Sequence, residues 1–211
     1  MNNKEKRKNP GWSGRMIELF AMIKEFIFDS DRSAIIVGAS RIDIYLERIL
    51  KLLLKEPSNP KEDSLFNIER PLSSFSSKID LAHRIGILTD QLALNIHLVR
   101  KLRNDTAHDA YPFDLQKMKD RNILDKLLKN YEVYEDIMED LQPIMLPDYA
   151  KSGDPCRVRL IIIMILMRLE GAMHEIAQTK QPRYVQDLKL LPLDVWRNDK
   201  DTLEWEFMSQ Q

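Results

Sequence analysis

The feature that most constrains the fold is an apolar run in the last third of the chain, at residues 158–169. Its uncharged stretch reaches only from Leu160 to Met167, far short of the roughly 20 residues that a membrane-spanning helix needs. We therefore predict a core helix over about residues 154–178 that is apolar on nearly every side. Such a helix must be covered all round, either as the central helix of a bundle or, in part, by a second copy of the chain.

The composition favours helices in the rest of the chain as well. Glycine is scarce, at 6 of 211 residues, and the common residues are mostly those that lose little side-chain freedom in a helix. Strand-like alternation of apolar and polar residues is absent. We predict an all-α, single-domain helical bundle of about six helices with a C-terminal extension. The expected helices cover about residues 13–28, 31–55, 73–86, 89–108, 114–141 and 154–178.

Local signals place several helix ends. Asp31, the serine pair at 73–74 and Thr89 are the expected N-caps of the second, third and fourth helices. Gly86 is well placed to end the third helix, because glycine adopts the left-handed conformation that follows many helices. Gly38, in the second expected helix, has no side chain, so we expect another helix to approach closely at this position.

The chain divides into three expected parts. Residues 1–12 form a flexible basic N-terminus, residues 13–180 the helical domain, and residues 181–211 a C-terminal extension packed on the bundle. The formal net charge of −1 gives no general attraction to nucleic acid or to an anionic membrane. The single cysteine, Cys156, excludes an internal disulfide and favours a reducing compartment. No signal peptide is visible, so we expect a cytoplasmic protein without a membrane partner.

A polar run at the end of the fourth helix, residues 103–108, is the main candidate site. It places a permanent cation, an amide, a carboxylate and an imidazole close together, and a small basic patch adjoins it. That patch could attract a phosphate group or pair with acids such as Asp80 or Asp105. The expected binding or structural polar cluster comprises Arg100, Lys101, Arg103, Asn104, Asp105 and His108.

Four pieces of sequence in this region resemble the mannitol operon repressor family. They are Pro-Leu-Ser-Ser-Phe at 71–75, Lys-Ile-Asp-Leu-Ala at 78–82, Ile-Gly-Ile-Leu at 85–88 and Arg-Asn-Asp-Thr-Ala-His at 103–108. The resemblance covers about residues 65–110 and departs from the family at Thr106, where an aromatic is usual. It implies an all-helical bacterial regulator of sugar-alcohol uptake operons. The chain shows no helix-turn-helix with a basic recognition helix and no zinc-finger spacing, so such a regulator would act through a protein partner.

The same polar run also resembles HEPN domains, whose ribonuclease members use an arginine followed a few residues later by a histidine. That resemblance implies a metal-independent endoribonuclease at a dimer interface. His108 would be the general base on a ribose 2′-OH, Arg103 would stabilise the developing charge, and Asn104 would orient the phosphate. On a regular helix, however, Arg103 and His108 point about 140° apart. They converge only if the helix ends between them or if a second chain contributes one of them.

The remaining candidates favour structural roles. His83 and His97 lie on helices with apolar neighbours and are expected at the edge of the core. His174-Glu175 lacks the second helical histidine of a metalloprotease, and no Cys/His cluster has metal-ligand spacing. We therefore expect neither a metal nor a cofactor.

The sequence-based interpretation is a non-enzymatic bacterial transcription regulator that acts mainly by protein–protein contact. The HEPN-type endoribonuclease is the alternative, and a phosphate-sensing module is the third class. A homodimer is expected from the apolar helix, and direct contact with DNA or RNA is left open.

Overall fold

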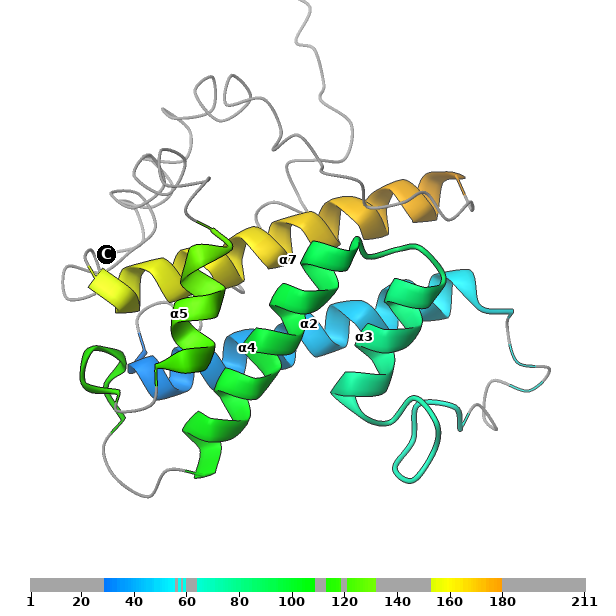
Figure 1. Cartoon of the computed structure of the whole chain (residues 1–211). Coiled ribbons are helices and arrows are strands. Elements are labelled where there is room, and N and C mark those ends of the chain that lie inside the picture. The colour runs from blue at the N-terminus through cyan, green and yellow to red at the C-terminus, as the bar shows by residue number, and fades with distance from the viewer. Residues whose placement is uncertain are drawn as a thin grey trace, which may run out of the picture.

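In the described residues of the computed structural model, five α-helices and one short 3₁₀ turn pack as a bundle (Figure 1). The structure describes residues 29–55, 57, 59, 64–108, 113–118, 121–131 and 153–179. No strand occurs among these residues, which confirms the all-α prediction. None of the helices in these ranges has the length and hydropathy needed to cross a membrane. The elements are α2 (Asp31–Leu53), α3 (Phe75–Arg84), α4 (Asp90–His108), η2 (Leu115–Lys117), α5 (Asn122–Lys129) and α7 (Gly153–Thr179).

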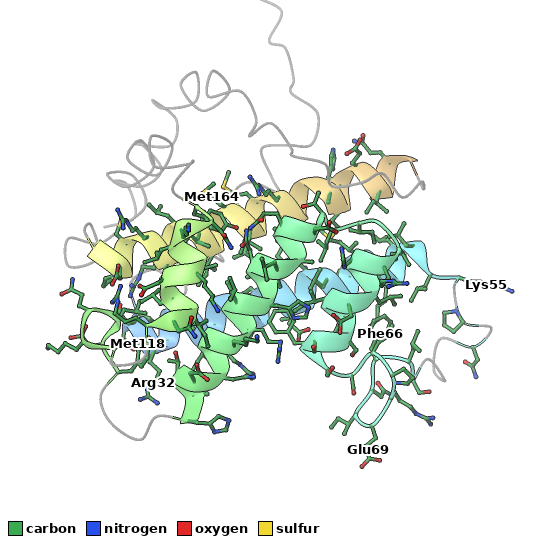
Figure 2. All side chains as sticks on the ribbon, viewed as in Figure 1. Arg32, Lys55, Phe66, Glu69, Met118 and Met164 are labelled. Carbon is green, nitrogen blue, oxygen red and sulfur yellow. The ribbon has the colours of Figure 1, made fainter. Side chains whose placement is uncertain are left out.

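The apolar helix α7 forms the core of the bundle together with α2. Each residue from 159 to 166 has an exposed fraction of 0%, including Met164, which is labelled in Figure 2. This burial confirms the prediction of a helix covered on every side, and it is achieved within one chain. The homodimer was expected because the apolar helix needed cover on every side. Since one chain provides that cover, the homodimer stays a prediction without this support.

Helix α4, which carries the polar run, packs mainly against α2, α3 and α5, and it also contacts α7. Figure 1 shows α3, α4 and α5 crossing the same side of α2, while α7 runs along α2. The polar run is thus attached to a helix that the core fixes over most of its length.

Three of the predicted helix ends are confirmed. Ser74 caps α3, since its Oγ accepts a hydrogen bond from the Ser77 backbone N at 3.0 Å. Thr89 caps α4 in the same way, with its Oγ1 3.2 Å from the Leu92 backbone N. Gly86 follows α3 with a φ of 80°, the left-handed conformation that glycine adopts without strain.

The prediction that Asp31 caps α2 is wrong by one residue. Ser30 is the N-cap, and its Oγ accepts from the Ser33 backbone N at 3.3 Å. Asp31 is instead the first residue of α2, and its carboxylate binds Arg159 of α7. A serine hydroxyl satisfies the free N–H, which leaves the aspartate for the buried cation.

The continuous helix expected over 114–141 is also wrong in its described part. The chain forms η2, then α5, and then a turn at Asn130 and Tyr131. Asp114 Oδ1 accepts from the Gln116 backbone N at 2.9 Å, and Asp31 Oδ2 accepts from the Leu115 backbone N at 3.1 Å. Such side-chain acceptors compete with the hydrogen bonds of a helix. The expected helix at 13–28, residues 1–12 and 132–141, and the extension at 181–211 lie outside the described residues.

Gly38 allows the close approach of α2 to α7. A Cβ at Gly38 would lie 2.7 Å from Ile162 Cγ2 and 3.1 Å from Ile162 Cδ1, and Ile162 is fully buried. We expect Gly38→Ala to lower the free energy of unfolding by about 1 kcal/mol, because overpacking outweighs the better helix propensity of alanine. Urea denaturation followed by circular dichroism measures this change.

The control for this prediction is the same substitution in an Ile162→Ala background. There the clashing methyl groups are gone, so Gly38→Ala should become neutral or stabilising. An equal loss of stability in both backgrounds would show that the Ile162 contact is not the cause.

Candidate functional site

The polar run lies on the regular C-terminal half of α4. The helix continues through His108, so it does not end between Arg103 and His108. Thr106 is fully buried, and its Oγ1 donates to the Leu102 carbonyl at 2.7 Å. The side chain of Thr106 is therefore both buried and hydrogen-bonded within its own helix.

The six expected site residues divide between two faces of α4. Arg100, Arg103 and Asn104 are half-buried, whereas the other three are exposed. The spacing of three and four positions places Arg103 and Asn104 on either side of Arg100. Asn104 also borders the exposed face, because it follows Lys101 by three positions and precedes His108 by four. We call the half-buried group, Arg100, Arg103 and Asn104, the α4 flank. The exposed face carries Lys101, Asp105 and His108.

The α4 flank consists of hydrogen-bond donors. Arg103 Nη1 donates to Asn104 Oδ1 at 3.0 Å, so the amide carbonyl is occupied and the amide Nδ2 is left to donate. Arg100 Nε is buried and has no hydrogen-bond partner. In the described part of the chain, no carboxylate forms an ion pair with Arg100 or Arg103. Within the described ranges, the flank is therefore positively charged and has no counterion.

The basic patch does not form the acid pairs that the sequence suggested. Asp80 Oδ1 lies 3.0 Å from His97 Nε2 instead, and Asp105 is exposed on the other face of α4. Lys101 is exposed too, and within the described ranges it has no ion-pair partner. The patch is thus split, with Lys101 on one face and the two arginines on the other.

One chain does not assemble the Arg103–His108 catalytic pair. The two residues lie on different faces of one regular helix, about 140° apart. Arg103 is half-buried and His108 is exposed at the last helical position. A ribonuclease site would therefore need groups from a second chain.

Two histidine–aspartate pairs join α3 to α4. His83 Nε2 lies 2.7 Å from Asp90 Oδ1, and His97 Nε2 lies 3.0 Å from Asp80 Oδ1. Both histidines are half-buried, as expected for residues at the edge of the core. These contacts, rather than the polar run, connect the two helices at their surface.

The sequence analysis missed Lys78 as the centre of an ionic cluster between α2 and α3. The side chain is almost fully buried, and its Nζ lies 2.9 Å from Asp43 Oδ1 and 3.0 Å from Glu47 Oε2. Burial would lower the pKa of Lys78, but the interactions with Asp43 and Glu47 outweigh it and raise the pKa. The signal in the sequence was the one-turn spacing of the two acids beside the apolar stripe of α2.

No metal or thiol chemistry is indicated by the described residues. Among them, no group of three or more His, Cys, Asp and Glu could hold a metal ion. Cys156 is buried, and burial raises the pKa of its thiol, which suppresses the reactive thiolate.

Comparisons with protein-family models, with curated proteins and with solved structures find no match to this chain.

Proposed function

We propose that this protein is a non-enzymatic bacterial transcription regulator that acts in the cytoplasm through contact with a protein partner. The resemblance of residues 65–110 to the mannitol operon repressor family is the basis for the class. The observation that carries the proposal is the α4 flank, where Arg100, Arg103 and Asn104 offer donors that no acid of the described residues occupies. Such a surface favours binding over bond cleavage.

The same geometry counts against catalysis within one chain. A general base must reach the proton that it removes, and a charge-stabilising cation must reach the same reacting group. His108 and Arg103 lie on different faces of α4, and neither contacts the other. In the described residues His108 also lacks a carboxylate that would orient its ring.

We expect Arg103→Ala to lose regulation, whereas His108→Ala should retain it. In a strain that lacks the gene, transcripts controlled by the protein are measured before and after each variant is restored. Co-purification of the protein partner from the same cells gives the second readout. The two substitutions are matched because both remove a polar side chain from the last two turns of α4, on opposite sides.

Three results would contradict this proposal. The first is unchanged transcription when the gene is deleted. The second is the absence of a retained partner with the wild-type chain. The third is RNA cleavage by the pure protein in chelator that His108→Ala abolishes, which would favour the HEPN-type ribonuclease instead.

A further inference from the structure

The α4 flank has the composition of an anion receptor. The guanidinium groups of Arg100 and Arg103 only donate hydrogen bonds, and the side-chain acceptor of the flank, Asn104 Oδ1, is already bound by Arg103. That bond also fixes the amide so that its Nδ2 remains available as a third donor. Arg100 Nε is removed from water, which lowers the local dielectric and strengthens the field of its charge.

We propose that the α4 flank binds the phosphate group of a small phosphorylated molecule. This site deepens the proposed function, because the ligand would compete with the protein partner for the same residues. The biological role of the site therefore rests on the proposed function. The two arginines carry a charge of +2, which matches the roughly −1.5 to −2 of a phosphate monoester near neutral pH. Three side chains on adjacent turns can each reach a different oxygen of a tetrahedral anion.

A carboxylate fits this site less well. It carries a single negative charge, and one guanidinium satisfies both of its oxygens in a bidentate pair. The second arginine would then still lack a counterion. A phosphodiester has the same shortfall, because each of its phosphate groups carries one charge. Charge matching therefore selects a terminal phosphate group.

The helix dipole does not oppose binding at this position. The negative end of a helix acts within its last turn, and in α4 that turn is formed by residues 105–108. Arg100, Arg103 and Asn104 all precede it. The nearest exposed acid on α4, Asp105, lies on the other face of the helix.

The test is a titration of the full chain with inorganic phosphate, followed by the amide NMR shifts of α4 at constant ionic strength. We expect saturable binding that chloride does not reproduce. Arg100→Gln and Arg103→Gln should each weaken binding by about tenfold, since each removes a charge-assisted contact. Lys101→Gln is the matched control, because it removes the same charge from the other face, and it should change binding less than about twofold.

A further variant gives the site a negatively charged side chain of the protein itself. Asn104→Asp places a carboxylate beside Arg103, so it should abolish phosphate binding while the circular dichroism spectrum stays unchanged. Equal weakening by Lys101→Gln, or the absence of saturation, would overturn the proposal. Acetate or a glutamate-rich peptide binding as tightly as phosphate would also overturn it, as would tighter binding of a short RNA.

The two proposals fail in different ways. If phosphate does not bind but Arg103→Ala still loses its protein partner, the proposed phosphate site is wrong and the proposed regulatory function stands. If phosphate binds as described but deletion of the gene changes no transcript, the proposed regulatory function is wrong and the proposed phosphate site stands. If both hold, phosphate should release the partner from wild type but not from Asn104→Asp.

Discussion

Replacement of Asp31 by alanine is expected to lower the free energy of unfolding by about 3–5 kcal/mol, because it removes one partner of a buried ion pair. Arg159 has an exposed fraction of 0%, and its Nη1 lies 2.7 Å from Asp31 Oδ1. Arg159 Nη1 also donates to the Pro155 carbonyl at 3.0 Å, and Nη2 donates to the Asp29 carbonyl at 2.8 Å. Without the carboxylate, the buried cation keeps these carbonyl contacts but loses the negative charge of Asp31.

The same carboxylate also holds η2 against the start of α2. Asp31 Oδ2 accepts from the Leu115 backbone N at 3.1 Å, so Asp31→Ala leaves a partly buried N–H without its partner as well. One aspartate thus joins α2, η2 and α7, three elements that are distant in the sequence. We therefore expect loss of cooperativity around η2 to accompany the loss of stability.

Urea denaturation at pH 7 measures the effect, and two variants control it. Asp105→Ala removes an exposed aspartate from α4 and should change stability by less than about 0.5 kcal/mol. The double variant Asp31→Ala, Arg159→Met removes both charges. It should recover much of the lost stability, because a buried site of this kind accepts an apolar side chain more readily than a charge without its partner carboxylate. A double variant no more stable than Asp31→Ala would show that the buried charge of Arg159 is not the cause.

The fold was predictable wherever the signal was local. The short uncharged run of α7 indicated its burial, and Ser74, Thr89 and Gly86 marked helix ends through bonds that reach only a few residues. Asp31 shows the limit of such reasoning. As an N-cap it is equivalent to Ser30, and the choice between them depends on Arg159, which lies 128 residues away. The position of η2 depends on a second distant contact of Asp31, in which its Oδ2 accepts from the Leu115 backbone N.

The candidate site was predictable in position but not in electrostatics. The spacing of Arg103 and His108 already implied different faces of α4, and the structure has that helix intact. The missing counterions were not predictable, because they depend on where other helices direct their acids. Asp80 bonds to His97, and Asp43 and Glu47 surround Lys78. Because these acids pair with other residues, the arginines of the α4 flank have no counterion among the described residues.

The Lys78 cluster gives the second large effect, and it depends on pH. Lys78→Met is expected to lower the free energy of unfolding by about 2 kcal/mol near neutral pH, because two partly buried carboxylates lose a charged donor. Burial would raise the pKa of Glu47, but hydrogen bonds from Lys51 and Lys78 outweigh it and hold the pKa below its ordinary value of 4.5. The pKa of Lys78 is raised above its ordinary value of 10.5 by Asp43 and Glu47.

The direction of each shift sets the pH window. A lowered carboxyl pKa stabilises the fold above the unfolded-state pKa, and this contribution is lost as the pH falls through the folded-state value. A raised lysine pKa stabilises the fold below 10.5, and this contribution is lost as the pH rises through the folded-state value. The difference between wild type and Lys78→Met should therefore be constant between about pH 5 and 10 and shrink on either side of that range.

Lys51→Met separates this cluster from ordinary surface pairing. Lys51 Nζ lies 2.8 Å from Glu47 Oε1, but the lysine side chain is 48% exposed. Water screens such a pair, so its loss should cost less than about 1 kcal/mol. Chemical denaturation of both variants from pH 3 to 11 makes the comparison. If Lys78→Met and Lys51→Met cost the same at every pH, burial of the Lys78 ammonium group contributes nothing, and α3 is held to α2 by its apolar contacts alone.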